Sequence, residues 1–265
     1  MATNKYQGIK YIENHQNLVD DNLTIEEALQ ININGKPFSI TMRTPNNDNE
    51  LITGLLYAED IYKGGEKLKI SFSKAEDSVI TEANILIDET LLKKGYSSSR
   101  NFLSASSCGI CGKTELENID MTYKIDDDIK FDISKLYKMF KLMKKDQTTF
   151  LLSGGSHASA AFDYDGNLLC SMEDVGRHNA VDKVVGGLIN NNLLDKAKIL
   201  TVSGRVSYEI IMKAFSAKVP ILAAVSAPSS LAVDFAKELG ITLLGFCREN
   251  KATCYAHPKR LNQLS

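Results

Sequence analysis

The sequence predicts a two-part α and β protein, with a mainly antiparallel, β-rich part over residues 1–125 and an α/β domain over residues 126–265. The first observation is the alternation of apolar and polar residues on both sides of Asn34-Gly35, which is typical of a β-hairpin. The second is a set of three strands rich in Ile, Leu and Val, separated by helical patterns, which indicates a buried parallel sheet. The third is the Ser- and Gly-rich segment 93–121, whose weak periodicity predicts a long mobile loop between the two parts.

The elements follow from local periodicity and turn residues. In the N-terminal part we expect a hairpin over 28–44, a helix over 49–62 and strands over 67–73 and 78–88. In the C-terminal part the expected elements are a helix over 132–146, a strand over 148–155, a hairpin over 158–172, a helix over 173–191, strands over 196–202, 219–227 and 241–248, and helices within 203–218 and 228–240. The domain boundary should fall between Asp120 and Phe131.

Composition excludes several classes of protein. The formal net charge of −2 argues against a generic nucleic-acid binder, and no apolar run is long enough to span a bilayer. The N-terminus lacks the apolar core of a secretory signal, so we expect a cytoplasmic protein with no membrane insertion. Five cysteines, an odd number, do not indicate a disulfide framework. Cys170, Cys247 and Cys254 lie in or beside apolar stretches and are expected to be small core residues.

Cys108 and Cys111 are different, because they form a C-x-x-C pair in the loop. A thioredoxin-like dithiol would need a preceding strand and a helix start, and the serine-rich residues upstream make a poor strand. Half of a zinc site would have to recruit distant ligands such as His157 or His178, since there is no second C-x-x-C. Sulfur carriage on a persulfide suits a thiol that must visit two partners. Spacing alone leaves these three uses open.

Basic and polar residues gather where helices begin. Arg177 and His178 lie near the start of the helix over 173–191, where the helix dipole favours acids, so a bound anion would explain them. Val181, Val184, Val185 and Leu188 should form the buried stripe of the same helix, and Gly154 to His157 could turn backbone N–H groups toward an anion.

The carboxyl ends of the parallel strands should meet at one edge of the sheet, where open α/β folds bind ligands. Helix capping accounts for Ser207 and Ser229 in the loops at this edge, but not for Arg205. The residues expected there are Ser203, Gly204, Arg205, Phe246, Arg248 and Lys251, together with Arg177 and His178. Hydroxyls, a glycine and cations in this arrangement predict a nucleotide or another phosphorylated ligand.

These segments together resemble the FdhD family of formate dehydrogenase accessory sulfurtransferases. The matching stretches, in the family's order, are TGLLYAEDI, SSCGICGK, SGGSHASAAFD, MEDVGRHNAVDKVVG, SGRVSYEIIMKA and SAPSSLAVDFAKELGITLLGFCR. They cover the chain from about Thr53 to the C-terminus, which is far more specific than any single motif.

The resemblance implies a sulfur carrier. Such a protein takes sulfur from a cysteine desulfurase and passes it to the molybdenum bis-guanine-dinucleotide cofactor, its substrate, before that cofactor enters formate dehydrogenase. By the same resemblance Cys108 carries the persulfide with Cys111 as its helper, the chain forms a homodimer, and no intrinsic metal is expected. The segment associated with cofactor binding maps to Phe246, Cys247, Arg248, Glu249, Asn250 and Lys251.

The implied C-terminal fold is a cytidine-deaminase-like, three-layer α/β domain with a mixed sheet. Deamination itself is not expected, because His157 is followed by Ala158 and Ser159 instead of an H-x-E pair, and the C-x-x-C precedes it. Two alternatives compete with sulfur transfer. A non-catalytic cofactor chaperone would bind guanine nucleotides without gaining sulfur, and a zinc-stapled binding module would carry stoichiometric metal.

Overall fold

The computed structural model describes residues 2–64, 67–74, 80–93, 96 and 123–262. The N-terminal part contains strands and one helix, with these bounds: β1 (Thr3–Ile12), β2 (His15–Thr24), β3 (Glu27–Ile33), β4 (Lys36–Arg43), α1 (Asp48–Ala58), β5 (Ile70–Lys74) and β6 (Ile80–Ile85). Among the described residues, none of the helices combines the length and apolar character that crossing a membrane requires.

Four of these strands form a sheet in the order β4-β3-β6-β5. The β3–β4 and β5–β6 pairs are antiparallel and the β3–β6 pair is parallel, so the mainly antiparallel prediction is confirmed. The hairpin turns at Asn34-Gly35 as predicted, and both residues have positive φ. Leu51, Ile52 and Leu56 of α1 pack on this sheet in a buried core.

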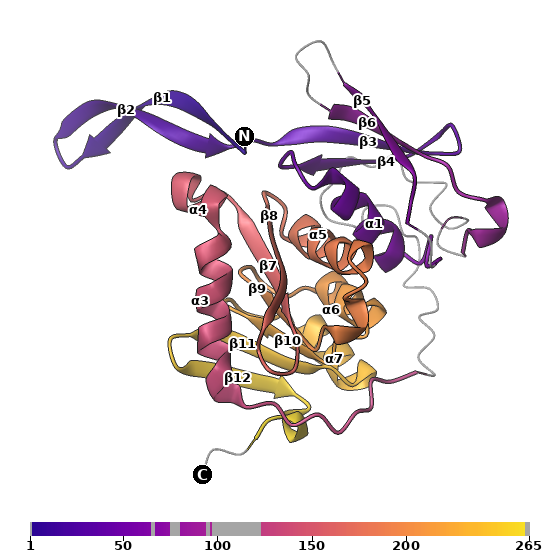
Figure 1. The fold of residues 1–265 in the computed structure, drawn as a ribbon. Helices are drawn as coiled ribbons and strands as arrows, with labels where there is room; N and C mark the ends of the chain where they lie inside the picture. The colour runs from indigo at the N-terminus through magenta and orange to yellow at the C-terminus, as the bar shows by residue number, and fades with distance from the viewer. Residues whose placement is uncertain (1, 65–66, 75–79, 94–95, 97–122, 263–265) are drawn as a thin grey trace.

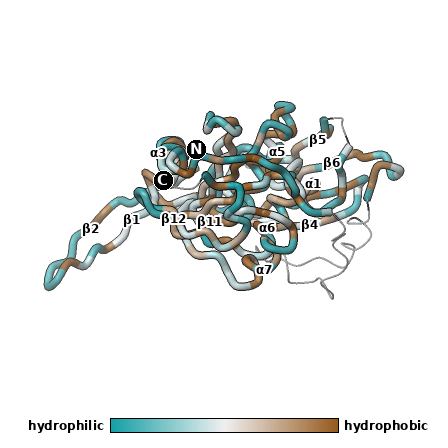
Figure 2. The backbone as a smooth tube through the Cα atoms, turned by 90° about the horizontal axis from the view of Figure 1, so that it is seen from below, coloured by the Kyte–Doolittle hydropathy of each residue, from teal (hydrophilic) through white to brown (hydrophobic). Residues whose placement is uncertain are grey.

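A second hairpin, β1–β2, was not predicted. It is a separate two-stranded sheet that extends away from the body of the molecule (Figures 1 and 2). Its apolar residues mix with polar ones on both strands, so no buried face marked it in the sequence. The large apolar side chains that it exposes are Tyr6, Ile9, Tyr11, Ile12, Leu18 and Leu23.

The C-terminal part is built on a six-stranded mixed sheet in the order β12-β11-β10-β9-β7-β8. Its helices and strands are α3 (Leu136–Asp146), α4 (Thr148–Ser153), β7 (His157–Phe162), β8 (Leu168–Asp174), α5 (Arg177–Asn190), β9 (Ile199–Val202), α6 (Tyr208–Ser216), β10 (Ile221–Ala224), α7 (Ser230–Leu239), β11 (Thr242–Arg248) and β12 (Lys251–Ala256). Short 3-10 turns lie at Glu89–Leu91, Ile133–Lys135, Leu194–Lys196 and Pro258–Arg260.

The parallel strands β9, β10 and β11 are confirmed, and β7 and β12 flank them in antiparallel pairings. Helix α3 covers one face of the sheet, and α5, α6 and α7 cover the other (Figure 1). Each face has its own buried core, and the predicted stripe of α5, including Val181 and Leu188, belongs to the core on the second face. Strand β12 was not predicted, because Lys251 to Ala256 is short and only its last residue, Ala256, is buried.

The prediction of a strand over 148–155 is wrong, because residues Thr148–Ser153 form helix α4. The carboxylate of Glu173 accepts hydrogen bonds from the backbone N–H groups of Thr149 and Phe150, at 2.8 and 2.9 Å, and so satisfies the free donors at the helix start. Gly154, with φ of 65°, ends the helix in a left-handed cap. The glycines therefore cap a helix and do not end a strand.

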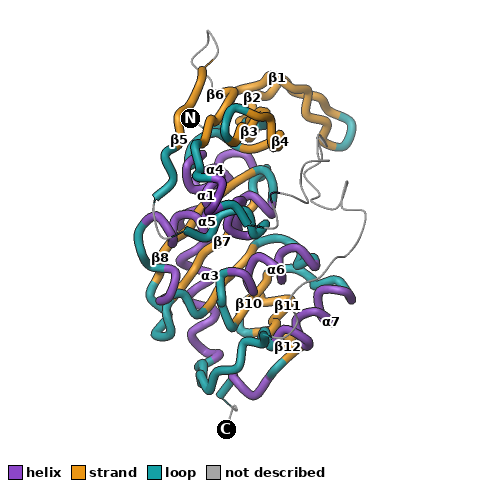
Figure 3. The backbone as a smooth tube through the Cα atoms, turned by 90° about the vertical axis from the view of Figure 1, so that its right-hand side faces the viewer, coloured by secondary structure: helices purple, strands orange, loops and turns teal. Residues whose placement is uncertain are grey.

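Helices α1 and α5 join the two parts and lie between the two sheets (Figure 3). They cross in backbone contact at Gly54 and Gly186. A Cβ atom added at Gly54 would lie 1.9 Å from the carbonyl oxygen of Asp182, and one at Gly186 would lie 1.9 Å from that of Glu50. Only glycine allows this approach, so the crossing explains both residues.

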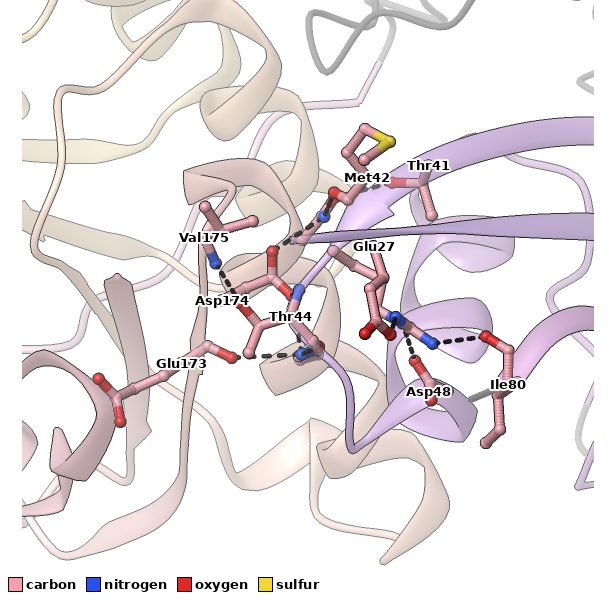
Figure 4. Close-up of polar contacts among 12 residues, drawn as sticks. Glu27, Thr41, Met42, Thr44, Asp48, Ile80, Glu173, Asp174 and Val175 are labelled. Atoms are coloured by element: carbon pink, nitrogen blue, oxygen red, sulfur yellow. Dashed lines mark hydrogen bonds and ion pairs between the residues drawn. The ribbon is translucent and has the colours of Figure 1, made fainter. Parts of the chain in front are cut away.

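A buried polar network strengthens the same junction (Figure 4). Asp174 and Lys183 form an ion pair with 2.7 Å between Oδ2 and Nζ, and both side chains are buried. Each of them also bonds to the backbone of Thr44, since Asp174 accepts from its N–H at 3.1 Å and Lys183 donates to its carbonyl at 2.9 Å. The Nδ2 group of Asn179 donates to the carbonyl of Met42 at 2.8 Å. These residues of β8 and α5 therefore bind the N-terminal part.

Candidate functional site

A cavity of about 690 Å³ opens at the carboxyl edge of the large sheet, on the face that α3 covers. Pockets of this size typically bind small molecules and cofactors. Residues from α3 and α4, from the turns that follow them, from the start of β7 and from the ends of β9, β10 and β11 line it: Tyr137, Phe140, Lys141, Met143, Lys144, Gln147, Phe150, Gly154, Gly155, Ser156, His157, Ser203, Val225, Cys247, Arg248 and Glu249.

Four of the predicted binding residues line this cavity, namely Ser203, Cys247, Arg248 and Glu249. Ser203 directly follows β9, and the other three end β11 or follow it. The guanidinium Nε of Arg248 donates to the carbonyl of Val225 at 3.4 Å. Burial raises the pKa of the Cys247 thiol to about 12, and its side chain packs in the core beneath α3. Cys247 therefore lines the cavity as a neutral, apolar group.

Helix α3 supplies cations and aromatic rings that the sequence prediction missed. Lys141 and Lys144 are exposed and line the cavity, together with Tyr137 and Phe140. Lys141 also lies over the Tyr137 ring, with 4.4 Å between Nζ and the ring centroid. The signal was present in the sequence, because lysines recur on the helix face opposite the buried Leu136, Met139 and Met143. Such lysines usually mark a helix face that is exposed to solvent. Only the fold shows that these two lie beside the edge of the sheet.

The turn between α4 and β7 brings His157 to the same cavity. Its Nδ1 lies 3.4 Å from the Ser203 hydroxyl, which in turn accepts a hydrogen bond from the Ala158 N–H at 2.9 Å. The pKa of His157 is lowered, first by burial and then by the positive charge of Arg177, with a smaller contribution from Arg205. A neutral imidazole therefore lies among cations at this end of the cavity.

Arg177 and Arg205 come close to the cavity without lining it. Arg205 is exposed, whereas the Nε of Arg177 is buried and has no hydrogen-bond partner among the described residues. Gly204 separates Arg177 from His157, since a Cβ at Gly204 would lie 3.4 Å from the Arg177 Cβ and 3.2 Å from His157 Nδ1. Of the cations predicted at the sheet edge, Arg248 lines the cavity, and Arg177 lies behind the lining residue His157.

His178 belongs to a different polar cluster, near the start of α6. Its Nε2 lies 3.2 Å from the Ser207 hydroxyl. Ser207 occupies the N-cap position of α6 but its side chain does not cap the helix, which differs from the capping expected for it, whereas Ser229 caps α7 as predicted. Burial, followed by the charges of Lys213 and Arg177, lowers the pKa of His178 to about 4.

A buried ion pair lies beside this histidine. Lys213 donates to both oxygens of Asp182, at 2.7 and 2.9 Å. Burial raises the pKa of Asp182 to about 6, although the positive charge of Lys213 acts to lower it. His178 and Asp182 therefore serve this inner cluster and neither lines the large cavity.

Phe246 lies in an irregular part of the β11–β12 pairing, between Gly245 and Arg248. Its φ of 53° is unusual for a non-glycine residue, and its ring is 49% exposed. Phe246, Asn250 and Lys251 do not line the cavity, although they neighbour residues that do.

Cys108 and Cys111 lie outside the described residues. The described cysteines are Cys170, Cys247 and Cys254, all of them free. Burial raises the pKa of each, to about 11 for Cys170, so none of the three is a reactive thiolate at neutral pH. In the described part of the chain no three His, Cys, Asp or Glu side chains gather as metal ligands.

Comparison with known proteins decides the family. The sequence model of the FdhD/NarQ family matches residues 24–262. The chain belongs to the FdhD/NarQ family. It is 41% identical over 250 residues to the "Sulfur carrier protein FdhD" of Picrophilus torridus, covering 92% of this chain and 93% of that one. It is 40% identical over 244 residues to the protein of the same name from Sulfolobus acidocaldarius, covering 92% of each chain.

A solved structure shares the fold of this FdhD/NarQ family member. It is a crystal structure from Desulfotalea psychrophila, of a protein provisionally described as a formate dehydrogenase accessory protein. The two structures match with a TM-score of 0.78 at 18% sequence identity, over 99% of this chain and 100% of that one. The mixed α/β fold is therefore shared along the whole chain.

Proposed function

We propose that this protein is a sulfur carrier, a sulfurtransferase that serves formate dehydrogenase. It takes persulfide sulfur from a cysteine desulfurase and transfers it to the molybdenum bis-guanine-dinucleotide cofactor before that cofactor is inserted. The observation that carries the proposal is the identity of about 40% with relatives named sulfur carrier proteins, over nine-tenths of the chain. The description of the Desulfotalea psychrophila protein supports formate dehydrogenase as the recipient.

Cys108 is the proposed carrier. Its thiolate attacks the terminal sulfur of the donor's persulfide, the donor's S–S bond breaks, and the donor leaves as a thiolate, so no net oxidation occurs. Attack of the Cys111 thiolate on the inner sulfur of the Cys108 persulfide then releases sulfide to the acceptor and leaves a Cys108–Cys111 disulfide. The two thiols thereby supply the two electrons that convert the carried sulfur to sulfide. The described cysteines support this assignment, because their raised pKa values disfavour the thiolate.

The large cavity is the proposed cradle for a guanine-nucleotide arm of the substrate. Lys141, Lys144 and Arg248 provide positive charge for its phosphates, and Tyr137 and Phe140 provide flat apolar surface for a base.

Binding of GDP tests the cradle. Lys144→Met and Arg248→Met should each weaken GDP binding in isothermal titration calorimetry, by about tenfold for a charge-assisted contact. Lys138→Met, which removes a lysine of α3 that does not line the cavity, is the matched control and should bind GDP like the wild type. Equal affinity in all four proteins would place the nucleotide elsewhere.

Three further features belong to the proposal. The C-terminal domain is cytidine-deaminase-like, which its helix–sheet–helix layers and mixed sheet support. The protein acts in the cytoplasm, where glutathione keeps thiols reduced. It forms a homodimer, which the exposed apolar side chains on the β1–β2 hairpin and on the adjoining helix α4 support, since Phe150, Leu151 and Leu152 are exposed as well.

A further inference from the structure

The wall of the large cavity contains a nearly buried amide, that of Gln147. This residue lies where α3 ends and α4 begins, and it is only 6% exposed. Its backbone is paired on both sides, since its N–H donates to the carbonyl of Lys144 at 3.2 Å and its carbonyl accepts from the N–H of Leu151 at 3.0 Å. The two helices therefore fix the position of Gln147 in the wall.

The side chain of Gln147 takes no part in holding the helices. Polar side chains at a helix start often cap it, but that of Gln147 forms no capping bond. The carboxylate of Glu173 accepts from the N–H groups of Thr149 and Phe150 in its place, at 2.8 and 2.9 Å. The Gln147 amide also forms no hydrogen bond with any other side chain or backbone group in the described part of the chain.

This free amide is open to the cavity. Four side-chain atoms among the described residues are both unpaired and shut off from water, and neither atom of the Gln147 amide is one of them. Its oxygen and its nitrogen therefore both keep exposed surface, on a residue that is otherwise buried and lines the cavity. The other buried polar lining residue, Ser156, is already paired, because its hydroxyl donates to Glu173 at 2.7 Å. Gln147 is thus the buried polar group of the lining that is left for a ligand.

The chemistry of an amide restricts what can pair with it. The oxygen only accepts and the NH2 group only donates, so a ligand satisfies both atoms when it carries a donor next to an acceptor. The oxygens of an ionised phosphate only accept and would leave the Gln147 oxygen unpaired. Guanine carries its N1–H donor directly beside its O6 acceptor, and this edge matches both atoms of the amide.

Aromatic side chains lie on both sides of Gln147 along the chain. Phe140 is two helical turns earlier on the same face of α3, and Phe150 follows on α4, and both line the cavity. Lys144, one turn before Gln147, lines it as well and brings a positive charge. The surroundings of the amide therefore offer apolar surface for a flat base and a cation for a phosphate on the same ligand.

We propose that Gln147 positions the guanine base by its N1–H and O6 edge. Its Oε1 atom accepts from N1–H and its Nε2 group donates to O6, while the base lies beside the phenylalanine rings. This inference rests on the proposed function, because it takes the cavity to be the cradle of a guanine-nucleotide arm. Adenine presents a donor and an acceptor in the reverse order, which an amide can meet by turning over. Gln147 therefore orients the base and does not by itself separate guanine from adenine.

Three nucleotides test this pairing in isothermal titration calorimetry on the full chain. In 1-methyl-GDP a methyl group replaces the N1 hydrogen and blocks the approach of the amide, whereas IDP keeps N1–H and O6 and lacks only the 2-amino group. The wild type should bind GDP at least about tenfold more tightly than 1-methyl-GDP, because the methylated base leaves the nearly buried amide unpaired.

Gln147→Met keeps the length of the side chain and removes the amide. It should weaken GDP and IDP by the same factor, about tenfold, and leave the affinity for 1-methyl-GDP unchanged, so that the preference for GDP over 1-methyl-GDP disappears. Gln16→Met, at an exposed position of β2 outside the lining, is the matched control and should bind all three nucleotides like the wild type. The preference is a ratio of two affinities within one protein, so a general loss of stability does not imitate its disappearance.

Other results would overturn the pairing and leave the cradle in place. Equal affinity of the wild type for GDP and 1-methyl-GDP would do so without any variant. If Gln147→Met weakened GDP and 1-methyl-GDP by the same factor, the amide would contact the ribose or the phosphates, and if it weakened neither, the amide would face only water. A wild-type protein that bound none of the three nucleotides would instead overturn the cradle itself, and this inference with it.

Discussion

At the scale of single residues, the polar side chains of the MEDVGRHNAVDKVVG segment divide into two roles. Asp174, Asn179 and Lys183 bind the N-terminal part, whereas Arg177 lies beside His157 at the large cavity. The sequence alone indicated a site there because charged residues are dense in it. Most of these charged residues are structural. Only the three-dimensional structure shows this, because Asp174 and Lys183 bond to Thr44, which lies more than a hundred residues away in the sequence.

The Asp174–Lys183 pair should be among the most sensitive positions of the fold. Lys183→Met leaves the buried Asp174 carboxylate without its counter-ion, so the free energy of unfolding in urea should fall by about 3 to 5 kcal/mol. Lys63→Met removes a lysine from an exposed pair with Asp60 and should change it by less than about 1 kcal/mol. Similar losses in the two variants would contradict a clamp at the junction.

His178 should make stability depend on pH. Its folded-state pKa of about 4 lies below the ordinary value of 6.5, so the unfolded chain binds the proton first as the pH falls. The stability that it contributes is complete above pH 6.5 and is lost, up to about 3 kcal/mol, as the pH drops to about 4.

Urea unfolding of His178→Gln between pH 7 and pH 4 checks this expectation. The variant should lose less stability over that window than the wild type, whereas His15→Gln, at an exposed position of β2, should keep the wild-type dependence. A His178→Gln curve parallel to that of the wild type would show that this histidine is not the group responsible.

At the scale of elements, α1 and α5 cross in close backbone contact. Gly54→Ala should lower the free energy of unfolding by about 1 to 3 kcal/mol, because the added Cβ would overlap the Asp182 carbonyl. Helix propensity acts the other way, since alanine is favoured over glycine by about 1 kcal/mol. The control is Gly8→Ala on β1, where the nearest atom would lie 3.8 Å away. If Gly54→Ala proved as stable as the wild type, the two helices would not be in backbone contact.

Helices and strands with a clear period of apolar residues were predictable from the sequence. Elements whose position depends on contacts with residues far away in the sequence were not. The hairpin at Asn34-Gly35 and the apolar strands β9, β10 and β11 follow from local pattern. Helix α4 does not, because its apolar run resembles a strand and its start is fixed by Glu173, more than twenty residues away. The β1–β2 hairpin lacks a buried face, so its sequence carries no periodic signal.

At the scale of the whole molecule, Ser203 and the Cys247–Glu249 segment line one ligand-sized cavity, because parallel strands end at the same edge of a sheet. Their role in binding stays a prediction. Lys141 and Lys144 were not predicted, because their role depends on how α3 packs across that edge. The assignment of Cys108 and Cys111 still rests on their spacing and on the family.

The proposed homodimer can be tested on the hairpin. Ile9 and Leu18 are paired across β1 and β2, and both are exposed. Replacing both with Glu should shift the mass in multi-angle light scattering from that of a dimer to that of a monomer, because charges would be buried in the interface. Leu86→Glu, at a position that is 78% exposed elsewhere on the molecule, should leave the mass unchanged. A dimeric mass in the double variant would place the interface on another surface.

The central claim is that Cys108 carries sulfur. Mass spectrometry of the intact protein after incubation with a cysteine desulfurase and cysteine tests it most directly. We expect a gain of one sulfur atom that is removed by a reductant, is retained in Cys111→Ala and is absent in Cys108→Ala. An unmodified wild-type protein, or a sulfur gain that persists in Cys108→Ala, would contradict it.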